Sequence, residues 1–137
     1  MKIYFSCSIT GGRDDQPTYT KIVNWMLEGG HEVLTAHLAK TETLAVEADV
    51  SPQAVFKRDI AWVDAAEVVV AEVSTPSHGV GYEIAYAVMR GKRVLCLARE
   101  GVKVSKMITG NDRLMFARYG EEREAMSEVE GFLKRKT

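Results

Sequence analysis

The chain has 137 residues, 46% of them hydrophobic, and a formal net charge of −1. This length suits one domain with one core, and the near-neutral charge gives no global attraction to nucleic acid or to an anionic membrane. No apolar stretch approaches the roughly 20 residues of a membrane span, and the N-terminus lacks a signal-peptide pattern. Cys7 and Cys96 lack metal-type spacing, which favours buried thiols in a reducing compartment. We therefore expect a single cytoplasmic domain over residues 1–137.

The first third of the chain begins with a predicted strand, Ile3–Ser8, that runs into a glycine-rich loop over 9–15. A helix should begin near Pro17, capped by Asp14 or Asp15, and end at the glycine pair 29–30. A short strand over 31–35 follows, and the weakly patterned stretch 40–50 is interpreted as a mobile lid. The apolar stripe of the predicted helix consists of Ile22, Val23, Met26 and Leu27.

The remainder of the chain alternates helices and strands. Ser51-Pro52 starts a helix that runs to about Ala66, with Phe56, Ile60 and Val63 on one face. A strand over 68–73, a helix over 79–90 and a strand over 93–98 come next. A fifth strand over 114–119 and a charged helix over 121–136 complete the pattern. Such alternation predicts an α/β fold, a doubly wound five-stranded parallel sheet with helices on both faces.

Residues 67–86 are the most informative segment, because an apolar run gives way to a Pro/Ser/Gly loop and then to a helix with Glu83 in its first turn. α/β proteins build anion-binding crevices from this order of elements. Ser77 and Gly79 lie in the same segment, and Tyr4 and Ser8 bracket the end of the first strand. Since the first and third strands of a doubly wound sheet are often neighbours, we expect these residues to share one crevice.

Two carboxylates in that crevice indicate glycosidic chemistry. Asp59 lies on a partly apolar helix face and would join Glu83 there. One carboxylate can attack or stabilise the anomeric carbon of a sugar while the other handles the proton of the leaving group. Hydroxyls and backbone amides at a helix N-terminus can bind a phosphate without a lysine. A nucleoside 5′-monophosphate places its phosphate and its anomeric carbon at a suitable separation.

Each residue also has a structural interpretation. Glu83 fits a carboxylate that complements the helix dipole, Asp59 fits a surface ion pair with Arg58, and Tyr4 fits ordinary strand packing. The glycine pair 11–12 fits a turn, and His37 fits a solvated loop. Glu72 is interpreted as structural, because from the end of its strand it can reach solvent or a loop N–H.

Three segments match one known pattern in combination: Tyr4-Phe5-x-x-Ser8-Ile9-x-Gly11-Gly12-Arg13, Asp59-x-x-Trp62-x-x-x-Ala66, and the block from Val69 to Glu83. Together they resemble the 2′-deoxynucleoside 5′-monophosphate N-glycosidases of the nucleoside 2-deoxyribosyltransferase superfamily. The similarity continues through 92–97 and 105–110 and so covers most of the chain. The block from Val69 to Glu83 is quite specific, whereas the glycine loop alone is weak.

The resemblance implies a flavodoxin-like, Rossmann-like sheet and hydrolysis of the bond between base and deoxyribose, with no cofactor and no metal. Glu83 would be the nucleophile at C1′, Tyr4 its hydrogen-bonding partner, and Asp59 the group that assists departure of the base. Relatives that act on ribonucleotides tend to carry phenylalanine in place of Tyr4, so the tyrosine favours deoxynucleotides.

The resemblance also implies ligands for the phosphate, namely Ser8, Ser77 and the Gly79 amide. A homodimer is expected, in which Ser105 and Met107 come from the second subunit. The expected partners are thus a small nucleotide and a second copy of the chain, with no nucleic acid polymer and no membrane.

The base and the sugar would be bordered by Ile9, Tyr19 and His37. Thr10 departs from the pattern, since animal members carry arginine there, and Cys7 replaces a common glycine. The loop residues expected in the binding site are Cys7, Thr10, Gly11, Gly12 and Arg13.

Three other functions remain open at this level. A deoxyribosyltransferase acting on free nucleosides would not need the serines, because a 5′-hydroxyl needs no anion site. A ribonucleotide N-glycosidase shares the glycine-rich loop and the glutamate. A non-catalytic nucleotide sensor would gain little from two carboxylates near a phosphate, since their repulsion is costly in a low-dielectric cleft.

Overall fold

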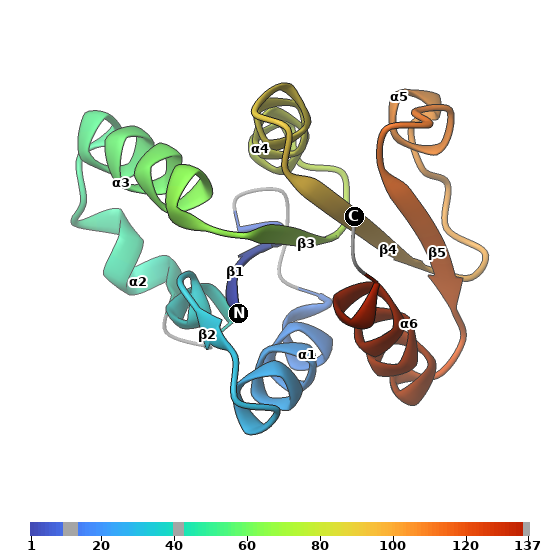
Figure 1. The fold of residues 1–137 in the computed structure, drawn as a ribbon. Helices are drawn as coiled ribbons and strands as arrows, with labels where there is room; N and C mark the ends of the chain where they lie inside the picture. The colour runs from blue at the N-terminus through green and yellow to red at the C-terminus, as the bar shows by residue number, and fades with distance from the viewer. Residues whose placement is uncertain (10–13, 40–42, 136–137) are drawn as a thin grey trace.

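The computed structural model describes residues 1–9, 14–39 and 43–135. Its centre is a parallel sheet of five strands in the order β2-β1-β3-β4-β5 (Figure 1). This is the predicted doubly wound α/β fold, with the strand order of flavodoxin-like proteins. The strands are β1 (Lys2–Ser6), β2 (Glu32–Val33), β3 (Val68–Glu72), β4 (Arg93–Arg99) and β5 (Met115–Tyr119).

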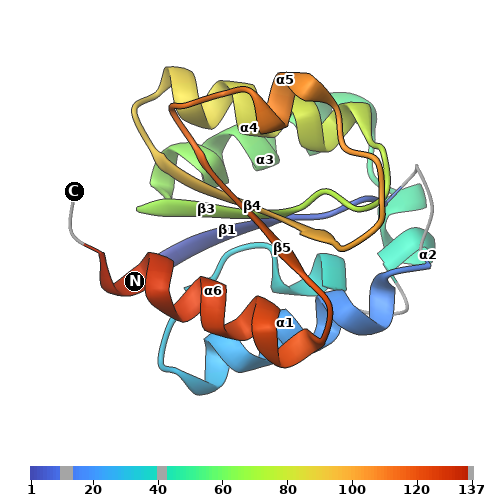
Figure 2. The same cartoon turned by 90° about the vertical axis from the view of Figure 1, so that its right-hand side faces the viewer.

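Helices cover both faces of the sheet, which gives the molecule three layers (Figure 2). Helices α1 and α6 lie on one face, and α3, α4 and α5 lie on the other. The helices are α1 (Gln16–Glu28), the 3₁₀ turn η1 (Ala36–Ala39), α2 (Thr43–Ala48), α3 (Pro52–Ala65), α4 (His78–Met89), α5 (Lys106–Thr109) and α6 (Glu122–Lys134).

The two-sided cover explains the apolar runs of the central strands. Every residue of β3 is buried, as expected for a parallel strand that packs against helices on both faces. Phe5 belongs to the core on the α1/α6 side, whereas Tyr4 belongs to the core under α3 and α4. Consecutive residues of β1 therefore serve opposite layers. Among the helices of the described residues, none has the length and apolarity needed to cross a bilayer.

Two helix stripes predicted from periodicity are only partly buried. Leu27, in the predicted stripe of α1, is 42% exposed, while the other three residues of that stripe are buried. Phe56 is 54% exposed, although Val63 on the same predicted stripe is fully buried. Phe56 lies in the N-terminal half of α3, where it lines a cavity. Helical spacing identifies an apolar face but not how much of that face the fold buries.

Local structure also differs from the prediction at three points. The stretch 40–50, interpreted as a lid, contains α2, and the short helices η1 and α5 were not predicted. Asp15 is the N-cap residue of α1, yet its side chain makes no capping hydrogen bond. The carboxylate instead accepts a hydrogen bond from Thr75 Oγ1 at 2.8 Å and pairs with Arg99 at 2.9 Å. Asp15 thus joins the loop after β3 to the end of β4.

Strands β1 and β3 are adjacent, as predicted, with Tyr4 opposite Val69 and Ser6 opposite Ala71. The strand order changes direction between them, because β1 leads outward to β2 and β3 leads outward to β4. Ligands of open α/β sheets bind at such a switch point, beyond the carboxyl ends of the strands.

Candidate active site

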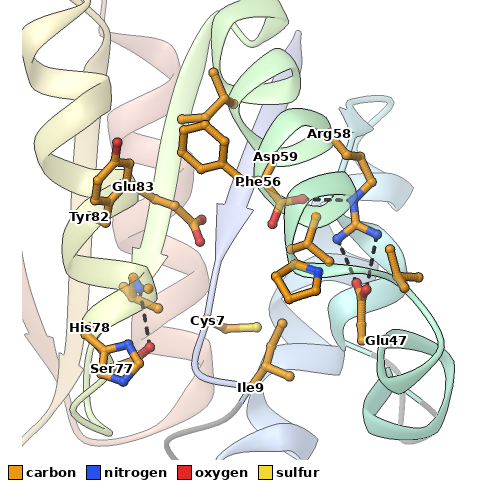
Figure 3. A pocket seen from close by; sticks show the side chains of 16 residues that line it. Cys7, Ile9, Glu47, Phe56, Arg58, Asp59, Ser77, His78, Tyr82 and Glu83 are labelled. Carbon is orange, nitrogen blue, oxygen red and sulfur yellow. Dashed lines mark hydrogen bonds and ion pairs between the residues drawn. The ribbon is translucent and has the colours of Figure 1, made fainter.

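A cavity of about 740 Å³ opens at this switch point, between α3 and α4 (Figure 3). Its walls come from the end of β1, the N-terminal half of α4, the facing side of α3, Glu47 of α2, and Val50 between α2 and α3. The cavity holds both predicted carboxylates, and most of its remaining lining is apolar. Its walls include Cys7, Ile9, Glu47, Val50, Pro52, Val55, Phe56, Arg58, Asp59, Ile60, Ser77, His78, Gly79, Val80, Tyr82 and Glu83.

Glu83 extends from α4 into the cavity toward Asp59 on α3 (Figure 3). It lies in the second turn of α4, which begins at His78, rather than in the first turn as predicted. Burial raises the pKa of Glu83 to about 7, and the nearby charge of Asp59 acts in the same direction. This carboxyl therefore changes its protonation state near neutral pH, as a group with a part in proton or nucleophilic chemistry is expected to do.

Two hydroxyls from β1 lie beneath Glu83. Tyr4 and Ser6 point to the same face of the strand because side chains alternate, and both are almost completely buried. Each hydroxyl acts on Glu83 as a donor, which lowers the pKa of this carboxyl and so favours its carboxylate form. Among the described residues, however, neither hydroxyl makes a hydrogen bond of normal geometry. Burial also raises the pKa of Tyr4 well above its usual range, so this phenol stays a neutral donor.

Asp59 belongs to a charged network rather than to a surface ion pair. Its Oδ1 accepts a hydrogen bond from Arg58 Nε at 2.9 Å, and the two side chains are only 15% and 25% exposed. Arg58 also contacts both carboxylate oxygens of Glu47, at 2.8 and 3.2 Å. His37 Nε2 lies 3.0 Å from Glu47 Oε1. Burial raises the pKa of Asp59, while Arg58 opposes that shift.

The N-terminus of α4 forms one end of the cavity. Ser77 caps the helix, and its Oγ accepts a hydrogen bond from the Val80 N–H at 3.3 Å. The Gly79 amide lies in the first helical turn, where backbone N–H groups have no helical partner. A Cβ at Gly79 would meet only the Ser77 Oγ, at 3.8 Å. Packing does not require a glycine there, although a closely bound ligand would.

The other predicted site residues are distributed unevenly. Cys7 and Ile9 line the cavity, and His37 stands behind Glu47, with its ring 5.5 Å from that of Trp62. Ser8 is completely buried where β1 ends. Tyr19 was expected beside the base but is fully buried against Phe5 on the α1 side of the sheet. The predicted ligands Thr10, Gly11, Gly12 and Arg13 lie outside the described residues.

Ser105 and Met107 line a second groove, of about 500 Å³, beside the first cavity. Ser77 and Val80 belong to the walls of both. Ser105 is the N-cap of α5 and accepts from the Met107 N–H at 3.2 Å, while Met107 is 82% exposed. Within one chain, these two residues therefore border the groove next to the carboxylates rather than the cavity that holds them.

Sequence reasoning missed two polar residues of the site, Ser6 and Glu47, and one contact of a third, Arg58. Ser6 could have been found, because it is spaced two residues from both Tyr4 and Ser8 on a strand. Glu47 lies in a stretch without a clear pattern, and only the fold brings it to Arg58. Arg58 was noticed, but its contact with Glu47 joins α3 to α2, and no local pattern predicts that pairing.

The chain belongs to the nucleoside 2-deoxyribosyltransferase family, whose model matches residues 3–132. A protein of Mus musculus, "5-hydroxymethyl-dUMP N-hydrolase", is 44% identical over 140 residues, which cover 97% of this chain and 78% of the relative. A protein of Tetraodon nigroviridis with the same name is 43% identical over 116 residues, which cover 82% and 81%. The structure of a Clostridium botulinum CMP N-glycosidase superposes with a TM-score of 0.72 at 18% identity, over 96% of this chain and 99% of that one. This last likeness concerns the fold.

Proposed function

We propose that this protein, acting as one cytoplasmic domain, hydrolyses the N-glycosidic bond of 2′-deoxynucleoside 5′-monophosphates to a free base and 2-deoxyribose 5-phosphate. The observation that carries the proposal is the placement of Glu83 and Asp59 in one cavity whose end is the N-terminus of α4. The names of the relatives support it, since the mouse protein is a hydrolase of a deoxynucleoside monophosphate.

The reaction proceeds in two displacements. The Glu83 carboxylate forms a bond to C1′ as the bond between C1′ and the base nitrogen breaks, and Asp59 gives a proton to the departing base. Water then attacks C1′, gives its proton to the Asp59 carboxylate and releases Glu83. Tyr4 and Ser6 favour the ionised form of Glu83 that the first step needs.

The phosphate binds at the first turn of α4, near Ser77 and the Gly79 amide. Free N–H groups and the helix dipole both favour an anion at this position. The glycine supports this role, because the fold leaves room for a side chain at position 79. Gly79→Ala should therefore fold normally and raise KM for the monophosphate, with little effect on any hydrolysis of unphosphorylated nucleosides.

A second copy of the chain completes the site in this proposal, with its Ser105 and Met107 placed at the phosphate. The groove that these residues border adjoins the cavity, and exposed Met107 and Tyr82 leave apolar surface for a subunit contact. Sedimentation should show at least a dimer, and a fully active monomer would contradict this arrangement.

The deciding experiment is a substrate panel. The purified protein is incubated with each deoxynucleoside monophosphate, with CMP and AMP, and with unphosphorylated deoxynucleosides plus an acceptor base. Release of base from the deoxynucleotides, well above release from the ribonucleotides, is expected. No base from any deoxynucleotide would reject the proposal, and faster base exchange between free nucleosides would indicate a transferase instead.

A further inference from the structure

Helix α2 brings a carboxylate to the active-site cavity that the proposed reaction does not use. Glu47 lines the cavity on the side of Asp59 and is only 12% exposed (Figure 3). Its two carboxylate oxygens accept hydrogen bonds from the two terminal nitrogens of Arg58, at 2.8 and 3.2 Å. Bidentate pairing of this kind fixes the plane of a guanidinium group.

Arg58 is held on three sides. Its terminal nitrogens bind Glu47, its Nε binds Asp59 at 2.9 Å, and its guanidinium carbon lies 4.9 Å from the centre of the Trp62 ring. Arg58 therefore divides its charge between two carboxylates, and Glu47 of α2 fixes the orientation of its guanidinium group. Since that group cannot rotate freely, its Nε holds the Asp59 oxygen in a fixed position.

The division of charge matters for a carboxyl that must carry a proton. An arginine whose charge acted on Asp59 alone would hold that group as a carboxylate. Glu47 offsets part of this attraction, and its own charge raises the pKa of Asp59. The other groups that face Asp59 are His37 from η1, Glu83 from α4 and Tyr4 from β1.

We propose that Glu47 and Arg58 form a positioning pair: Arg58, held by Glu47, aims the Asp59 carboxyl at the leaving base, and Glu47 offsets the charge of Arg58 so that this carboxyl can still hold the proton that the base takes. The inference rests on the proposed function, because it assigns the pair a task in base departure. Glu47 and Arg58 act through Asp59, and neither needs to touch the substrate.

The test compares Glu47→Gln with Arg58→Gln. Removing the negative charge of Glu47 should lower the pKa of Asp59, whereas removing the positive charge of Arg58 should raise it. If Glu47 and Arg58 only supported the fold, the two variants would not move the pKa of Asp59 in opposite directions. Carboxyl ¹³C signals report the titration, measured in a Glu83→Gln background so that the neighbouring glutamate does not titrate as well.

Activity supplies the second readout. Glu47→Gln in the otherwise native chain should lower kcat about tenfold with KM nearly unchanged, a fraction of the roughly 10²–10⁴-fold that general acid catalysis supplies. Glu47→Asp keeps the negative charge, so the pKa of Asp59 should stay raised, even if α2 packs less well. Arg90→Gln, which breaks the exposed Arg90–Asp64 pair between α4 and α3, is the matched control and should change neither quantity.

The outcomes separate the two proposals. If the native protein hydrolyses deoxynucleotides but both variants leave the Asp59 pKa and kcat unmoved, or move that pKa in the same direction, the positioning pair is wrong and the proposed function stands. If the native protein releases no base, the proposed function fails, and the task of the pair in base departure fails with it, even where the titration shows the two opposite shifts.

Discussion

Two glutamates, Glu72 and Glu83, lie 11 positions apart, and their surroundings differ. Glu72 ends β3 and is completely buried. Its oxygens accept hydrogen bonds from the Ser74 N–H at 2.6 Å, from the Ser74 hydroxyl at 2.9 Å, and from the Tyr119 hydroxyl. Glu83 projects from α4 beside two hydroxyls that have no partner of normal geometry in the described part of the chain.

This difference separates a structural carboxylate from one that is available for chemistry. Burial raises the pKa of both groups. At Glu72 the donors bind the carboxylate and join the ends of β3 and β5 through Tyr119, whereas at Glu83 the lone pairs still face a cavity. A carboxylate that accepts a full set of hydrogen bonds contributes to stability. A carboxylate with an incomplete set can exchange hydrogen-bond partners during a reaction.

The largest expected effect is on activity at Glu83. Glu83→Gln should lower kcat at least about 10⁴-fold, the scale on which removal of a covalent nucleophile acts. The variant should unfold at an equal or higher temperature, because it no longer buries an ionisable group. Base release and thermal unfolding measure the two effects, and near-native activity would remove Glu83 from the role of nucleophile.

Tyr4→Phe tests the hydroxyl beneath the nucleophile. The change should lower kcat for deoxynucleotides by about 10- to 100-fold, as expected for one hydrogen bond to a charged group, worth roughly 1.5–3 kcal/mol. It should also narrow the preference for deoxyribose over ribose. The kcat/KM ratio for dCMP and CMP measures that preference, and an unchanged ratio would show that Tyr4 does not set it.

Glu72→Gln should act on stability instead. The amide nitrogen of glutamine cannot accept the hydrogen bonds that the carboxylate accepts, so the free energy of unfolding should fall by about 1–3 kcal/mol. Urea denaturation measures this loss, with Glu83→Gln as the matched control. If both variants lost equal stability, the contrast between the two glutamates would be false.

The raised pKa of Glu83 also predicts how stability depends on pH. Between its ordinary value of 4.5 and about 7, the folded state binds more protons at this site than the unfolded state does. The contribution of Glu83 to stability is therefore greatest below pH 4.5 and declines as pH rises toward 7, by at most about 1.4 kcal/mol per pH unit. Unfolding curves from pH 5 to 8 should show this decline in the native chain and less of it in Glu83→Gln.

The smallest expected effect is at Ser6. Ser6→Ala removes a hydroxyl that favours the carboxylate form, so the pKa of Glu83 should rise above about 7. Carboxyl ¹³C titration detects the shift, and Ser6→Thr, which keeps the hydroxyl, is the control. A lower pKa in Ser6→Ala would contradict the orientation of Ser6 toward Glu83.

Periodicity alone predicted the five strands, the parallel sheet and the adjacency of β1 and β3. These features depend on which residues are apolar and on the short connections between elements, which the sequence states directly. The same pattern brought Glu83, Asp59 and Ser77 to one edge of the sheet. Ser6 could have been placed with them, since it lies two residues after Tyr4 and so on the same face of the strand.

Only the tertiary structure decided which polar groups meet. The contacts of Arg58 with Glu47, of Glu72 with Tyr119 and of Asp15 with Arg99 join segments whose packing no local pattern encodes. The burial of Tyr19 against Phe5 and the exposure of Phe56 beside the cavity were decided in the same way. Local spacing specifies the face of a helix or strand on which a side chain lies. The partner of a charged side chain depends instead on interatomic distance and burial, which are set only when the layers pack together.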